Sequence, residues 1–164
     1  MTKLERREFL DNSNFMLDTE EMALARSKST AKNKIAFAVM LKFFQIEGRY
    51  PNKRDIISQS MLDSVMVQLN CLDVNFDNYD WEGRTTERFR KEIRALLGYK
   101  RPTSSDITKL SEWFVESVFL KVPTLPQAQE KAYEFFAKNK LEPLSVSNLD
   151  ICISRPLHNC IKNH

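Results

Sequence analysis

The sequence predicts an all-α protein, a helical bundle built from two tandem helix-turn-helix-like lobes. Glycine occurs only three times in 164 residues and phenylalanine is the commonest aromatic residue, which does not suit a β-rich chain with many tight turns. Apolar residues also recur with the period of a helix. In the clearest case, Phe89, Ile93, Leu96 and Leu97 fall at i, i+4, i+7 and i+8, which is one helical face.

Capping residues and apolar stripes define the helices of the first lobe. Asp18 is a suitable N-cap, with acidic residues in the turn that follows it. The next helix is apolar on almost every side, which places it in the middle of a bundle. Gly48 ends this helix, and Pro51 opens the following one. We therefore expect helices at residues 1–10, 18–26, 31–47 and 53–70.

The second lobe carries similar signals. Gly98 and Pro102 end its first helix. Thr103, with Asp106 three residues later, forms a capping-box pattern for the next helix. Pro126 occupies the favoured first position of a third helix. We therefore expect helices at residues 84–97, 104–121, 126–139 and 146–154.

The two lobes are expected at residues 1–72 and 79–164, joined by a stretch rich in Asp and Asn at about 73–78. A faint internal repeat accompanies this division, because residues 48–56 can be laid over residues 98–107. Both segments contain a Gly, a basic and aromatic turn, and a Pro-x-x-x-Asp-Ile pattern, the outline of a helix-turn-helix unit. The repeat is either a duplication or a chance similarity between two helix–proline–helix junctions.

Composition excludes several classes of protein. The longest apolar run, residues 35–41, is far too short to span a membrane. The first residues contain no hydrophobic signal core, and three cysteines without regular spacing fit reduced thiols. We expect a cytoplasmic protein.

Positive charge is concentrated in two blocks. The net charge of +3 is small, but residues 31–54 contain six basic residues against one acidic residue, and residues 81–101 contain seven against three. Between these blocks, residues 55–80 contain five aspartates and no Lys or Arg. This distribution suits a protein that presents two positive surfaces to a polyanion. The alternative is that each block is a solvated polar face.

The basic residues gather at helix junctions, where they are placed to bind the backbone of double-stranded DNA. Lys and Arg neutralise phosphates without sequence preference. The N-termini of the helices expected at 53–70 and 104–121 add backbone N–H groups and a positive dipole end. The candidates for reading base edges are Arg49, Asn52, Arg54, Arg84 and Arg90. The full set of candidate DNA-binding residues is Lys32, Lys34, Arg49, Asn52, Lys53, Arg54, Arg84, Thr85, Arg88, Arg90, Lys91, Arg94, Lys100, Arg101, Thr103, Ser104 and Ser105.

The helix at 84–97 has two faces. Phe89 is expected in the core and Arg90 on the surface. Arg90 and Arg94 lie four residues apart and repel each other, so an external anion is their expected partner. The i,i+4 pairs expected to form within this helix are Glu87 with Lys91 and Arg88 with Glu92.

Two stretches resemble the N-terminal region of the transposases of replicative class II transposons, the Tn-three family. The first contains Trp-Glu-Gly-Arg-Thr at 81–85 and Arg-Lys-Glu-Ile-Arg-Ala-Leu-Leu-Gly-Tyr at 90–99. The second contains Asn-Lys-Ile-Ala-Phe-Ala-Val-Met-Leu at 33–41, closed by Glu-Gly-Arg at 47–49. The resemblance runs in order from about Leu4 to about Leu120, and the order and spacing of the motifs carry it.

The resemblance implies a function. Such a region recognises the terminal inverted repeats of its transposon, and its partners are double-stranded DNA and the remaining domains of the transposase. The family uses an Asp-Asp-Glu triad with magnesium, which would lie beyond residue 164. We therefore expect a non-catalytic fragment that needs no cofactor of its own. The resemblance also implies a bacterial, nucleoid-associated protein.

Some residues depart from the family pattern. Gln45 and Ile46 precede Gly48 where a basic residue is often found, so a phosphate contact is lost there. Phe89 occupies a position where the family frequently has His. An apolar side chain that packs in the core therefore replaces a polar one.

Other motifs point to no chemistry of their own. Four residues near the C-terminus have zinc-ligand side chains but fit no common finger spacing: Cys152, His158, Cys160 and His164. Asp73 begins a calcium-loop pattern that fails at Asn78 and Arg84, where Gly and Glu are required. Instead, Trp81 is expected to be buried and Asp80 to cap the turn that follows it. The sequence contains no Gly-rich phosphate loop and no nucleophile elbow.

Two rival functions fit the same residues. A helical protein–protein interaction module would carry its basic face incidentally, and a stand-alone DNA-binding regulator of the same fold would act without a catalytic partner. The sequence does not distinguish a fragment from a natural short protein.

Overall fold

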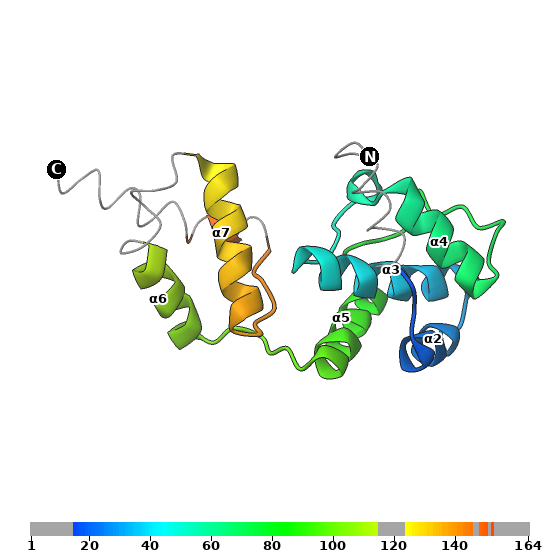
Figure 1. The fold of residues 1–164 in the computed structure, drawn as a ribbon, viewed down its shortest axis with the longest axis horizontal. Coiled ribbons are helices and arrows are strands. Elements are labelled where there is room, and N and C mark those ends of the chain that lie inside the picture. The colour runs from blue at the N-terminus through cyan, green and yellow to red at the C-terminus, as the bar shows by residue number, and fades with distance from the viewer. Residues whose placement is uncertain (1–14, 115–123, 146–147, 151, 153–164) are drawn as a thin grey trace, which may run out of the picture. The chain divides into compact units, whose positions relative to one another are not determined.

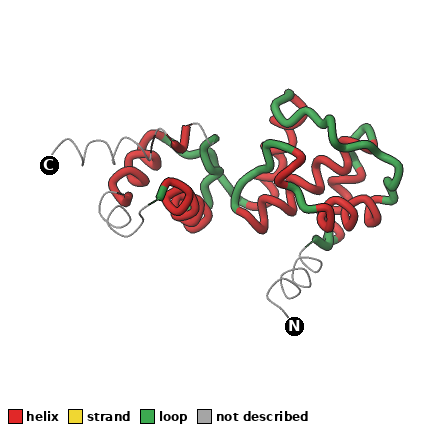
Figure 2. The backbone as a smooth tube through the Cα atoms, turned by 90° about the horizontal axis from the view of Figure 1, so that it is seen from above, coloured by secondary structure: helices red, strands yellow, loops and turns green. Residues whose placement is uncertain are grey.

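A computed structural model describes residues 15–114, 124–145, 148–150 and 152. The fold is all-α, as predicted, and Figure 2 shows helices and loops without a strand among the described residues. The helices of Figure 1 are α2 (Thr19–Arg26), α3 (Ala31–Glu47), the 3-10 helix η1 (Arg54–Ile56), α4 (Gln59–Leu69), α5 (Arg84–Leu97), α6 (Ser104–Trp113) and α7 (Leu125–Lys138). Within the same residues, no helix is long and apolar enough to cross a membrane.

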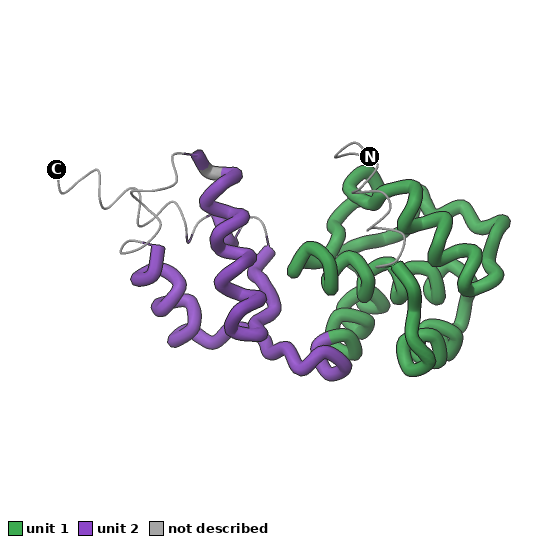
Figure 3. The backbone as a smooth tube through the Cα atoms, viewed as in Figure 1, with its two compact units in different colours: residues 1–93 green, residues 94–164 purple. Residues whose placement is uncertain are grey.

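The chain divides into two compact units, Met1–Ile93 and Arg94–His164, shown in Figure 3. The division therefore falls inside α5, whereas the sequence placed the linker at 73–78. That stretch belongs to the first unit because its Phe76 is buried, 5.2 Å from the ring of Tyr79 and 5.6 Å from that of Trp81. The three rings form an aromatic cluster that fixes the loop before α5.

Helix α3 forms the centre of the first unit (Figure 1). Every residue from Ile35 to Phe44 is buried, as expected for a helix that is apolar on almost every side. α2 and α4 pack against it and against each other, and Phe89 of α5 meets Phe37 edge to face at 5.6 Å. The bounds of α3 match the prediction, and Gly48 ends it with a φ of 73°, a conformation that glycine adopts without strain.

One charged residue of α3 is buried with its partner. The Lys42 ammonium lies 2.8 Å from the Glu21 carboxylate of α2, which also accepts hydrogen bonds from Gln45 and from the backbone N–H of Asp18. Burial alone raises the pKa of the Glu21 carboxyl, but the bonds from Asp18, Lys42 and Gln45 outweigh it and hold the pKa below its ordinary value. The pair thus joins α2 to the central helix.

The helix expected at 53–70 begins later than predicted. η1 covers three residues, Ile57 is extended, and α4 begins only after Ser58, whose hydroxyl accepts a hydrogen bond from the Met61 N–H. The Arg54 guanidinium stabilises this break, because it donates to the Ile57 carbonyl at 2.8 Å and to the Gln59 side chain at 2.7 Å. The sequence signal for this later start is Ser58, a favourable N-cap residue.

Helix α5 has the predicted bounds and the predicted core face. Thr86, Phe89 and Ile93 are buried, and Gly98 follows the helix with a φ of 74°. The loop before it is held as expected, since Trp81 is buried and an Asp80 carboxylate oxygen accepts from the Glu82 N–H at 3.0 Å.

The second unit has a core of its own, made by α6, α7 and the segment after α7. The Thr103–Asp106 capping box is present at the start of α6. α7 begins one residue before the predicted start, with Thr124 as N-cap. Backbone bonds join Lys100 to the segment around Leu141 as an isolated β-bridge. The buried core residues are Leu110, Phe114, Ala128, Ala132, Phe136, Leu141 and Leu149.

Three predicted helical stretches lie outside the described residues in whole or in part. They are residues 1–10, residues 115–121 of the helix expected at 104–121, and most of 146–154, of which 148–150 and 152 are described and helical.

Candidate nucleic-acid interface

Three cations form an exposed stripe along α5. Arg84, Arg88 and Lys91 are spaced i, i+4 and i+7, so they share one helical face. All three are exposed, on the side opposite the buried Phe89 and Ile93. None of the three pairs with a carboxylate within the described part of the chain. We call these three residues the α5 stripe.

Arg90 faces a different direction and has internal partners. Its guanidinium contacts the Glu87 carboxylate at 3.2 Å, donates to the Trp81 carbonyl at 3.3 Å and lies 5.5 Å from the ring of Tyr50. The expectation of an unpartnered surface arginine is therefore wrong. Arg90 connects α5 to the loop before it and to the turn after α3.

Arg94 is also satisfied within its own unit. Its guanidinium lies 2.6 Å from the Glu142 carboxylate, and the two side chains are only 12% and 14% exposed. Arg90 and Arg94 therefore each have a carboxylate partner in the chain, Glu87 and Glu142 respectively. Their i,i+4 repulsion does not require the external anion that the sequence suggested. Glu142 is 48 residues away in the sequence, so periodicity carried no signal for this pair.

The pairs predicted within α5 are also replaced in part by tertiary contacts. Glu92 binds Lys28, whose ammonium lies 2.5 Å from the Glu92 carboxylate and 4.5 and 5.2 Å from the rings of Phe37 and Phe89. Lys28 thereby ties the link between α2 and α3 to α5. Arg88 instead donates to the Thr85 hydroxyl at 3.2 Å.

Of the predicted DNA-binding residues after α3, some are exposed and others contact the rest of the protein. Asn52 and Lys53 are exposed. Arg54 is engaged with α4 and contacts Asp77 of the acidic segment at 3.4 Å, and the Arg49 guanidinium lies 5.7 Å from the ring of Phe43. Because the helix begins at residue 59, Asn52 does not stand at a helix N-terminus as predicted.

At the start of α3, Lys32 and Lys34 are half-buried and no acidic residue occupies the first turn. The Lys32 ammonium donates to the Asn78 side chain at 2.9 Å, which places this end of α3 beside the loop that leads to α5.

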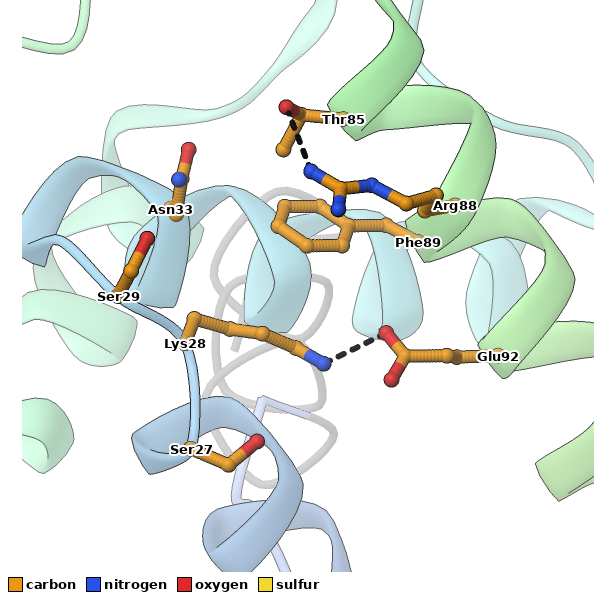
Figure 4. A pocket seen from close by; sticks show the side chains of 8 residues that line it. All are labelled: Ser27, Lys28, Ser29, Asn33, Thr85, Arg88, Phe89 and Glu92. Atoms are coloured by element: carbon orange, nitrogen blue, oxygen red, sulfur yellow. Dashed lines mark hydrogen bonds and ion pairs between the residues drawn. The ribbon is translucent and has the colours of Figure 1, made fainter.

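A pocket of about 220 Å³ lies between the start of α3 and α5 (Figure 4). The link before α3 and Asn33 form one side, and the first two turns of α5 form the other. We call it the α3–α5 pocket. It is lined by Ser27, Lys28, Ser29, Asn33, Thr85, Arg88, Phe89 and Glu92.

The pocket brings together residues in or next to the two basic blocks of the sequence, 31–54 and 81–101. Thr85 and Arg88 were predicted as DNA-binding residues, whereas Ser29 and Asn33 were not, although they flank the predicted Lys32. The only sequence signal for this side was a polar run, Ser-Lys-Ser-Thr at 27–30, immediately before the most apolar helix.

The predicted residues of the second unit surround the start of α6. Lys100, Arg101 and the serines that begin α6, residues 104 and 105, are exposed. The Asp106 carboxylate accepts a hydrogen bond from the Thr103 N–H at 2.8 Å. The hydrogen bonds from the backbone and the side chain of Thr103 lower the pKa of the Asp106 carboxyl. A carboxylate therefore already stands at this helix N-terminus, where the sequence had suggested a phosphate.

No metal-binding group is found in the described residues, where no three His, Cys, Asp or Glu side chains come together. Of the C-terminal Cys and His residues, only Cys152 is described, as a free thiol.

The comparison with protein families gives one match. A family model described as a domain of unknown function (DUF4158) matches residues 5–142. The chain belongs to this family. Neither a curated protein nor a solved structure matches the chain. The DUF4158 match includes the whole α5 stripe, the α3–α5 pocket and both members of the Arg94–Glu142 pair, so these features lie within the family domain.

Proposed function

We propose that this DUF4158 domain is the N-terminal DNA-binding region of a replicative transposase and recognises the terminal inverted repeats of its transposon. The α5 stripe is the observation that carries the proposal. Its three cations are held in one row by a helix whose opposite face is buried, so their positions are preorganised. A row of exposed Arg and Lys side chains neutralises phosphates and releases counterions.

The dimensions of the stripe suit a DNA groove. Arg84 and Lys91 are seven residues apart, which corresponds to about 10 Å along a helix axis. The major groove of B-DNA admits an α-helix, and Arg pairs with guanine there. Lys32, Lys34 and Lys53 supply further cations in the first unit, and Lys100 and Arg101 supply a separate basic surface in the second.

On this proposal the domain positions DNA but does not cut it. Magnesium and the Asp-Asp-Glu triad belong to another region of the transposase, which is a second partner besides double-stranded DNA.

One observation favours a second function, protein–protein interaction. Val67 and Leu72 are 66% and 61% exposed, and Met16 is 59% exposed. Gln68 places residue 16 beside α4, because its side chain bonds the Phe15 carbonyl and the Leu17 N–H. Exposed apolar side chains of this kind occur at sites of protein association.

Gel retardation separates the two functions. The wild-type chain is tested with terminal-repeat duplex and with shuffled duplex, next to a variant with Arg84, Arg88 and Lys91 changed to Ala. A matched control changes Lys109, Lys131 and Lys138, which are exposed on α6 and α7, to Ala. We expect tighter binding to the terminal repeat, loss in the stripe variant and retention in the control. Equal retardation of both duplexes would contradict repeat recognition, and no retardation of either at low salt would leave protein association as the better account.

A further inference from the structure

We propose that the α3–α5 pocket binds one phosphate group of a DNA backbone. The inference rests on the proposed DNA-binding function and assigns it a defined subsite. The pocket is not made by one element, because its polar side chains come from the link before α3, from α3 itself and from α5.

The pocket is lined by groups that donate hydrogen bonds. Ser29 and Asn33 lie on one side, and Thr85 and Arg88 face them from the other (Figure 4). These side chains offer two hydroxyls, one amide and one guanidinium. A phosphate accepts hydrogen bonds on all of its free oxygens, and Arg forms the bidentate pair that fits it best.

The charge inside the pocket favours an anion. Its ionised residues are Lys28, Arg88 and Glu92. The Glu92 carboxylate is bound by the Lys28 ammonium, so its charge is already compensated. Arg88 is exposed, and its contact with the Thr85 hydroxyl at 3.2 Å holds the guanidinium at the rim of the pocket.

The size of the pocket suits a small group. A volume of about 220 Å³ is below the range of roughly 300–1,000 Å³ that holds drug-sized molecules and cofactors. A single phosphate group fits such a space. We assign this phosphate to the DNA backbone because Arg88 belongs to both the pocket and the α5 stripe. A phosphate in the pocket therefore lies next to the row of cations proposed to track DNA.

Adding a negative charge to the pocket, or removing a hydroxyl from it, tests the inference on the full chain. Ser29→Asp places a carboxylate on the exposed link, and Ser60→Asp adds the same charge at an exposed position of α4 outside the pocket. Thr85→Val removes a hydroxyl without changing the size of the side chain. Binding to a duplex is measured by fluorescence anisotropy, and thermal melting reports folding.

We expect Thr85→Val to weaken duplex binding about tenfold, the effect of one lost hydrogen bond to a charged group. Ser29→Asp should weaken it at least as much, because its carboxylate also repels the phosphate, while Ser60→Asp binds like the wild type. In proton–nitrogen NMR spectra, the duplex and inorganic phosphate should both shift the Asn33 side-chain amide. If Ser29→Asp fails to fold, Thr85→Val and the NMR titration decide the result.

Three outcomes would overturn the inference. If the α5 stripe variant loses DNA binding but Ser29→Asp and Thr85→Val bind normally, the proposed function stands and the pocket is not a phosphate subsite. If inorganic phosphate shifts Asn33 but no duplex binds, the pocket takes a free phosphate and the DNA-binding function fails with the inference. If neither ligand shifts Asn33, the pocket binds no phosphate.

Discussion

Buried charges hold the first unit together at the scale of single residues. Lys42 and Glu21 join α3 to α2, and Lys28 and Glu92 join the link before α3 to α5. In both pairs the ammonium is nearly buried, with exposed fractions of 7% for Lys42 and 10% for Lys28. Removing one member of the Lys42–Glu21 pair, in which both side chains are buried, leaves an uncompensated charge and typically costs about 3–5 kcal/mol. The Glu92 side chain is 42% exposed, so the Lys28–Glu92 pair contributes less. These lysines therefore stabilise the fold.

The Glu21 pair predicts a specific dependence of stability on pH. The folded-state pKa of Glu21 lies below its ordinary value, so the pair stabilises the protein fully above the unfolded pKa, about 4.3 for Glu. This contribution is lost as the pH falls through the folded pKa. Urea denaturation between pH 7 and pH 3 measures it.

The matched control is the double variant Glu21→Gln, Lys42→Met, which removes both charges and approximately keeps the side-chain volumes. We expect its free energy of unfolding to fall less steeply below pH 5 than that of the wild type. Parallel pH profiles for the two proteins would show that this carboxylate does not control acid stability.

At the scale of elements, the position of each arginine around α5 decides whether its side chain faces solvent or contacts the rest of the protein. Arg84 projects away from the core, whereas Arg90 contacts Glu87, the Trp81 carbonyl and the Tyr50 ring. We expect Arg90→Ala to cost about 1–2 kcal/mol, because a hydrogen bond and a cation–π contact are lost together. Arg84→Ala should change stability by less than about 0.5 kcal/mol. Chemical denaturation of both variants checks this.

The same two variants should reverse their order in DNA binding. Arg84→Ala should reduce the salt dependence of binding by about 0.9 in slope, the value for one phosphate contact. Arg90→Ala, assayed where it is folded, should keep the wild-type slope. A larger loss of slope for Arg90→Ala would place Arg90 at the interface and the α5 stripe away from it.

Local signals predicted the elements better than they predicted the site. α3 and α5 were predicted with their observed bounds because each combines a cap or glycine stop with a clear apolar pattern. Helical spacing also predicted Arg84, Arg88 and Lys91 as polar-face candidates, but it grouped them with Arg90 and Arg94, which have internal partners. The partners of Arg90 and Arg94, and the pocket beside Asn33, depend on residues distant in the sequence, such as Tyr50 and Glu142. Tertiary packing sets those contacts, and a single sequence carries no record of them.

At the scale of the whole molecule, internal ion pairs reduce the number of cations that can reach DNA. Arg54, Arg90 and Arg94 each contact a carboxylate of the chain. The exposed Lys and Arg candidates are Lys53, Arg84, Arg88, Lys91, Lys100 and Arg101. Lys53, Arg84, Arg88 and Lys91 lie in the first compact unit and Lys100 and Arg101 in the second, so on the proposed function each unit would bind phosphates with a basic surface of its own.

This set predicts the salt dependence of DNA binding by the full chain. Six phosphate contacts at about −0.9 each give a slope near −5 for log affinity against log salt. Anisotropy titrations of one duplex between about 50 and 200 mM salt measure this slope, and the stripe variant should lower it by nearly 3 because it removes three contacts. A wild-type slope near −1 would mean that most of these side chains are merely hydrated, and the two basic surfaces would then need a different explanation.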